Sequence, residues 1–149
     1  MSHIESPLIQ LQDEPAFTLM LDPQVPVLIN TLKPVAQTRA QFHAHVLTVI
    51  GTLERLKPQY PNLFFITDSR NFETIGGEDV QFITRQMDRL RATGVAGVVT
   101  IVPYQEKGMP FVESVTETIA AHGFWNVMAV NMEEAYGYLE GARSLHNPA

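Results

Sequence analysis

Asn62-Leu-Phe-Phe-Ile-Thr-Asp-Ser-Arg-Asn-Phe-Glu-Thr-Ile-Gly-Gly-Glu-Asp79 is the stretch that decides the fold. Its apolar part, Leu63 to Ile66, has the length and composition of a buried strand. The apolar run stops at Asp68, where we expect the chain to leave the core and present polar groups at an edge of the sheet. Gly76 and Gly77 then lead into a helix pattern. The stretch therefore predicts a strand, a polar loop and a helix start, with the loop as candidate site.

The segments on both sides alternate between strand and helix patterns. Two apolar runs joined around residues 22–24 predict a hairpin, because Pro23 suits a turn. Apolar residues at helical spacing predict a long helix over Gln37–Leu56 and a second helix over Glu78–Ala92. Val95–Val102 is nearly all apolar, which is typical of a central parallel strand covered on both faces.

The last third of the chain continues this alternation. We expect a helix over 111–121, a strand over 124–130 and a short final helix that ends at Gly141. The order β-β-α-β-α-β-α-β-α predicts a single α/β domain whose mixed, mostly parallel sheet has helices packed on it. The predicted domain covers 16–142, preceded by a flexible arm or weak edge strand over 1–15 and followed by a tail over 143–149.

Size and composition exclude several classes of protein. The chain has 149 residues, 45% hydrophobic and 17% charged, and a net charge of −6 that disfavours nucleic acid as a partner. It contains no cysteine, which excludes disulfides and thiolate metal sites. It has no apolar run of the roughly 20 residues that a membrane helix needs, and its start does not resemble a signal peptide. We therefore expect a cytoplasmic protein without stable membrane insertion.

The element order, Phe64-Phe-Ile-Thr-Asp68 before a loop and helix, and Val127-Met-Ala-Val-Asn-Met-Glu-Glu-Ala-Tyr-Gly-Tyr-Leu139 near the end resemble the STAS domain. The resemblance is strongest to the SpoIIAA-like, anti-sigma-factor-antagonist-like proteins, and it covers roughly Phe17 to Glu140. It implies a small non-catalytic regulator that binds a protein partner and is switched by phosphorylation. In that family, a Ser or Thr at the start of the second helix takes the phosphate.

The region equivalent to the family's phosphorylation site is Thr74-Ile75-Gly76-Gly77, so the family's serine has no counterpart here. Ser69 and Thr74 are the nearby hydroxyls that could take a phosphate. Three acidic side chains crowd the spot, and a phosphate would add about −1.5 to −2 further charges. The alternative is that Thr74 or Gly77 only caps the helix.

Polar residues that follow the parallel strands form the candidate binding surface. Ligands in open α/β sheets sit beyond the carboxyl ends of the strands, where an Arg, a Lys and a Tyr could together hold a small anion. The alternative is that these are solvated loop residues. The predicted binding residues are Asp68, Ser69, Arg70, Thr74, Gly76, Gly77, Tyr104 and Lys107.

Metal and acid–base chemistry find little support in the sequence. His43 and His45 are two residues apart, so they point to different sides of their helix, whereas paired ligands on a helix are three or four apart. A magnesium site at Asp68 would need further acidic residues, and the first hairpin offers only Asp22. We expect no metal, no cofactor and no catalysis.

Two functions remain open from the sequence. The first is a non-enzymatic regulatory module that docks a protein partner on the 69–77 loop and the second helix. The second is a small-molecule binder or modest enzyme with a pocket between the 68–77 and 103–110 loops, lined by Tyr104, Lys107 and Arg70. A homodimer contact through Tyr136 or Tyr138 is also expected, since one of these tyrosines should face outward.

Overall fold

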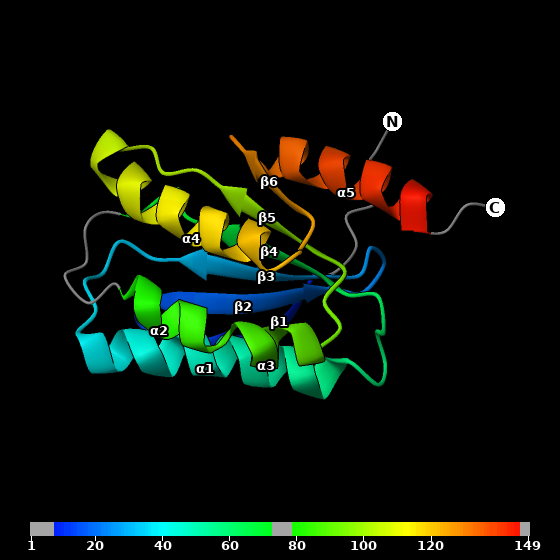
Figure 1. Cartoon of the computed structure of the whole chain (residues 1–149), viewed down its shortest axis with the longest axis horizontal. Coiled ribbons are helices and arrows are strands. Elements are labelled where there is room, and N and C mark those ends of the chain that lie inside the picture. Colours follow the sequence, from blue (N-terminus) through cyan, green and yellow to red (C-terminus); the bar gives the residue numbers. More distant parts are fainter. Residues whose placement is uncertain (1–7, 73–78, 147–149) are drawn as a thin grey trace.

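Six strands form one mixed sheet with helices on both faces (Figure 1). The structure is a computed structural model that describes residues 8–72 and 79–146, and of 145 and 146 only the backbone. The elements are β1 (Ile9–Asp13), β2 (Phe17–Asp22), β3 (Val27–Leu32), α1 (Arg39–Leu56), β4 (Phe64–Asp68), α2 (Val80–Arg85), α3 (Met87–Ala92), β5 (Gly97–Ile101), the 3-10 helix η1 (Glu106–Gly108), α4 (Met109–Ala121), β6 (Asn126–Ala129) and α5 (Met132–His146).

The strands lie side by side in the order in which they occur in the sequence. β1, β2 and β3 are antiparallel neighbours, whereas β3, β4, β5 and β6 run parallel. This arrangement confirms the predicted α/β class with a mixed, mostly parallel sheet. The N-terminal segment contributes β1, an edge strand in which Ile9 and Leu11 remain 45% and 39% exposed.

Helices cover the two faces of the sheet unequally. α1, α3 and α4 pack on one face, around a cluster that includes Leu28, Phe65 and Val98. α5 packs alone on the opposite face, where Ile66 and Leu139 belong to a second cluster. Successive residues of a strand point to opposite faces, so each central strand contributes side chains to both clusters. The sequence of such a strand is therefore almost continuously apolar. None of the helices in the described part of the chain is long and apolar enough to cross a membrane.

The predicted helix over Glu78–Ala92 is wrong as a single element, because it is divided at Gln86. There the backbone has φ −92° and ψ −2°, and the N–H of Gln86 donates to the carbonyl of Ile83 at 2.9 Å, as in a tightened 3-10 turn. α3 turns its Met87 and Leu90 into the core, whereas α2 has no buried residue.

The predicted end of the last helix at Gly141, with a tail from 143, is also wrong. α5 continues to His146. Ala142 is 3% exposed within the second cluster, so packing holds the helix together past the glycine. α4 likewise starts at Met109 rather than at Phe111, because a proline at the first helical positions loses no hydrogen bond.

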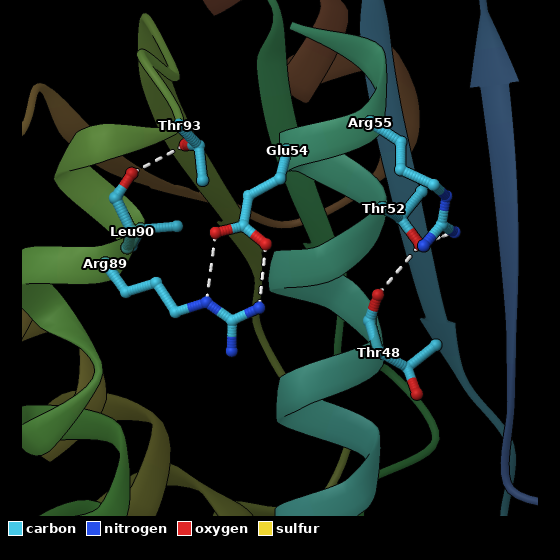
Figure 2. A network of polar contacts seen from close by, with 7 residues as sticks. All are labelled: Thr48, Thr52, Glu54, Arg55, Arg89, Leu90 and Thr93. Carbon is cyan, nitrogen blue, oxygen red and sulfur yellow. Dashed lines mark hydrogen bonds and ion pairs between the residues drawn. The ribbon is translucent and has the colours of Figure 1, made fainter.

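An ion pair joins α1 to α3 on the surface. Figure 2 shows the Glu54 carboxylate facing the Arg89 guanidinium, with Arg89 Nε and Nη2 donating at 3.0 and 2.7 Å. The hydrogen bond from Arg89 lowers the pKa of Glu54 and raises that of Arg89 itself. Both side chains are exposed, so the pair orients the helices and adds little stability.

The glycine at the start of β5 is required by the packing of the aromatic residues around it. A Cβ at Gly97 would lie 2.4 Å from Trp125 Cε3 and 3.3 Å from Phe64 Cδ1. Gly97→Ala is therefore expected to lower the free energy of unfolding by about 2 kcal/mol through overpacking, as measured by urea denaturation.

The matched control is Gly141→Ala in α5, where a Cβ meets nothing within 4 Å. That change is expected to raise stability by up to about 1 kcal/mol, because alanine favours helix over glycine. Equal effects of the two substitutions would contradict the packing described for Gly97.

Candidate functional site

A cavity lies between the sheet and the helices α1, α3 and α4, toward the carboxyl ends of the parallel strands. Its volume is about 150 Å³. Most of its wall is apolar, and a minority of its lining residues carry polar side chains. It is lined by Asn30, Leu32, Lys33, Val35, Gln37, Phe42, His45, Val46, Val49, Ile50, Phe65, Thr67, Ser69, Phe72, Ile83, Gln86, Met87, Leu90, Thr100, Phe111, Val112, Val115 and Ile119.

A row of polar side chains crosses the floor of the cavity. Asn30 pairs with Thr67, and Thr67 pairs with Thr100, so the three residues lie side by side on β3, β4 and β5. Two residues earlier on the same strands and the same face, the corresponding row belongs to the apolar core. The floor therefore changes from apolar to polar toward the carboxyl ends of the strands, where ligands bind in open α/β sheets.

His45 holds the polar row in place from α1. Its Nε2 bonds Asn30 Oδ1 at 2.9 Å, and its Nδ1 bonds Gln37 Nε2 at 3.2 Å. Asn30 Oδ1 can only accept and Gln37 Nε2 can only donate, so the imidazole is the neutral tautomer that carries its proton on Nε2. Both ring nitrogens are occupied within the protein.

The position of His45 is fixed by packing as well as by hydrogen bonds. Its ring stacks on Phe17 with centroids 3.7 Å apart and an interplanar angle of 9°. The residue is 6% exposed, and burial lowers its pKa to about 4. His45 is therefore uncharged at neutral pH, and its ring forms part of a rigid wall.

Three phenyl rings close another side of the cavity. Phe111 meets Phe42 edge to face at 5.8 Å between centroids and stacks with Phe72 at 5.3 Å. Phe72 can approach because residue 108 is glycine, where a Cβ would lie 2.9 Å from Phe72 Cδ2. The aromatic wall thus joins α1, the loop after β4 and the start of α4.

A second histidine on α1 ties the start of α2 to that helix. His43 Nε2 bonds Asp79 Oδ2 at 2.9 Å, and its ring stacks on Phe82. Asp79 Oδ1 also caps α2 by accepting from the N–H of Phe82 at 3.0 Å. The His43 hydrogen bond, followed by the one from this N–H, lowers the pKa of Asp79. These contacts position Ile83 of α2 at the cavity wall.

The structure separates the predicted cluster of Asp68, Ser69 and Arg70. Arg70 Nε and Nη2 donate to the two carboxylate oxygens of Asp68 at 2.9 and 2.7 Å, and this hydrogen bonding raises the pKa of Arg70. Ser69 points to the face of the sheet opposite to that of Asp68, and it lines the cavity. Only one of the three residues therefore contributes to the cavity, since Asp68 and Arg70 satisfy each other.

The side chains predicted to form a pocket, Arg70, Tyr104 and Lys107, do not line this cavity. Tyr104 is 72% exposed and Lys107 is also exposed, and none of the three side chains lines the cavity. The backbone N–H of Tyr104 donates to the carbonyl of Arg70 at 3.1 Å, so these two residues are neighbours outside the cavity.

The two predicted phosphorylation sites have different outcomes. Ser69 is 2% exposed, so a kinase could reach its hydroxyl only if the loop opened. Thr74, Gly76 and Gly77 lie outside the described residues. Their predicted roles stay predictions.

The sequence interpretation missed Asn30, Gln37, His45, Thr67 and Thr100. One signal was present, because each of three consecutive strand patterns carries a polar residue two positions after an inward apolar residue. A second signal is that His45 occurs at helical spacing from the apolar residues of α1, and thus on its buried stripe.

Metal binding and comparison with known proteins add no further assignment. Across residues 8–72 and 79–146, no group of three or more His, Cys, Asp or Glu side chains could hold a metal ion. The sequence matches no model of a known protein family, and neither the curated proteins nor the solved structures contain a significant match to it. The geometry of the cavity is therefore what bears on function.

Proposed function

We propose that this protein binds one compact, largely apolar small molecule in the cavity between the sheet and α1, α3 and α4. The observation that carries the proposal is an apolar cavity whose floor bears an ordered row of polar side chains. Small-molecule sites combine these features, since apolar walls supply affinity and a few placed polar groups orient the ligand. A cavity of about 150 Å³ suits a ligand with about one aromatic ring.

A ligand explains the cavity better than imperfect packing does. Protein cores are close-packed, so core side chains that line an unfilled hollow lack the packing contacts that they make elsewhere. The hydroxyls of Thr67, Ser69 and Thr100 make no hydrogen bond to any other described residue. A ligand that occupies the cavity would restore contacts on both the apolar and the polar walls.

The site favours binding over catalysis. His45 has both ring nitrogens engaged, by Asn30 and Gln37, so it has no free nitrogen to take a proton from a ligand. Lys33 also lines the cavity, and its ammonium is bonded to Asp13 at 2.7 Å. The Ser69 hydroxyl makes no hydrogen bond to a base among the described residues. These engagements support a non-enzymatic binder.

The proposal is tested by titration with cumene, an apolar ring with a branched substituent. Free cumene at about four times its Kd is expected to raise the free energy of unfolding of the wild-type protein by about 1 kcal/mol. The Val46→Phe variant should lose this effect, because the larger ring fills the cavity from its partly buried wall on α1. Thermal unfolding followed by calorimetry measures the change in the free energy of unfolding.

The matched control is Val130→Phe, at an exposed position after β6 that does not line the cavity. It should retain the full stabilisation by cumene. If wild-type protein is not stabilised, or if both variants respond alike, the cavity is not the binding site.

The resemblance to STAS domains supports a second candidate, a regulatory module that docks a protein partner on α2. It is favoured by the absence of any buried residue in α2. Arg39 is 69% exposed and Arg85 lies over the Phe82 ring, so the two cations flank this surface. Charge reversal at these two arginines should abolish recovery of the partner from the native host; undiminished recovery would exclude this surface.

A further inference from the structure

The amide of Asn30 indicates which chemical group a ligand presents to the cavity floor. Asn30 is 6% exposed, and its Oδ1 is occupied by His45 Nε2. Its Nδ2 has no hydrogen-bond partner among the described residues. This atom is not among the unpaired polar atoms that are inaccessible to solvent. Since Asn30 lines the cavity, its two N–H donors open into it.

The chain of hydrogen bonds behind Asn30 sets this direction. Gln37 Nε2 donates to His45 Nδ1, and His45 Nε2 donates to Asn30 Oδ1. Rotating the Asn30 amide would bring its N–H groups against the N–H of His45, and the donors would repel. The arrangement therefore holds Asn30 with its nitrogen toward the cavity, as preorganised binding groups are held.

The charges around the cavity indicate that the ligand group is neutral. The described lining residues include no carboxylate, and the single lysine among them is paired with Asp13. A buried charge without a partner is strongly unfavourable. The Thr67 hydroxyl beside Asn30 can donate to the same acceptor, since it also lacks a partner in the described part of the chain.

We infer that the ligand carries an uncharged carbonyl group, such as that of a ketone, amide or ester, and that this oxygen accepts from Asn30 Nδ2 and the neighbouring Thr67 hydroxyl. This inference rests on the proposed binding function and adds the chemical class of the ligand. The apolar remainder of the molecule lies against the phenyl rings of Phe42, Phe72 and Phe111.

The test compares acetophenone with cumene, which has a similar size and branching and no acceptor. Their affinities for the wild-type protein and for an Asn30→Asp variant are measured by titration calorimetry. The variant keeps an acceptor for His45 and replaces the donor with oxygen. The ratio of the acetophenone Kd to the cumene Kd is expected to rise at least tenfold in the variant, the loss of one buried hydrogen bond.

The matched control is Asn62→Asp, which introduces the same charge at an exposed position before β4. It should leave the ratio unchanged. If both probes bind the wild-type protein and the ratio does not change in Asn30→Asp, the carbonyl inference is wrong while the binding function stands. If neither probe binds the wild-type protein, the binding function itself is wrong.

A second readout does not depend on the variant folding. The carbonyl stretching band of acetophenone bound to wild-type protein is expected at lower frequency than that of acetophenone in an alkane, because hydrogen bonding weakens the C=O bond. An unshifted band would overturn the inference.

Discussion

Replacing His45 with alanine is expected to lower the free energy of unfolding by about 4 kcal/mol. The substitution removes a ring that stacks on Phe17 in the core. It also leaves Asn30 Oδ1 and Gln37 Nε2 without partners at positions that are 6% exposed in both residues. The two losses add, because lost packing and unsatisfied buried polar groups are separate contributions. Urea denaturation followed by circular dichroism measures the change.

The control for this substitution is His43→Ala on the same helix. The side chain of His43 is 28% exposed, and it bonds Asp79 near the surface. Its removal should cause a much smaller loss of stability. Equal losses for the two histidines would contradict the role assigned to His45.

The second large effect is a dependence of stability on pH. Burial lowers the pKa of His45 to about 4 from an ordinary value of 6.5. Between these values the unfolded chain binds a proton that the folded protein does not, so stability falls as the pH falls. The contribution of His45 is complete above about pH 6.5 and lost toward pH 4, and the lost stability amounts to roughly 3 kcal/mol.

This dependence is isolated by comparison with a His45→Gln variant. Other titrating groups are common to both proteins, so the difference between their stability curves reports His45. The stability of wild-type protein should decline by roughly 3 kcal/mol more than that of the variant between pH 7 and pH 4. Parallel curves over this range would show that the pKa of His45 is not lowered in the folded protein.

The order of elements could be predicted from periodicity, and the ends of the elements could not. Strand β5 and helix α1 were recognised because their apolar patterns are long and regular. The break at Gln86 and the continuation of α5 past Gly141 depend on how the helices pack against the sheet. The local sequence favours an unbroken helix at Gln86 and a helix end at Gly141. Tertiary contacts therefore decide where these helices break and end.

The predicted binding residues follow the strands at the edge of the sheet where the cavity lies, but of those that the structure describes only Ser69 lines it. Polar residues after a strand attract attention because they interrupt an apolar run, yet Asp68 and Arg70 neutralise each other there. Polar residues of the cavity floor lie within the strands, as Thr67 does in β4. Whether a polar side chain within a strand faces a cavity or the packed core depends on the helices above it.

Binding of a ligand in the cavity is tested most directly by methyl NMR of isoleucine-labelled protein. Cumene is titrated into the protein while the δ1-methyl signals are followed. Ile50 and Ile83 line the cavity, whereas Ile66 and Ile101 belong to the cluster on the opposite face of the sheet. We expect saturable shift changes at the first pair and unchanged signals at the second. Absence of saturable changes at Ile50 and Ile83, or equal changes on both faces, would contradict the account.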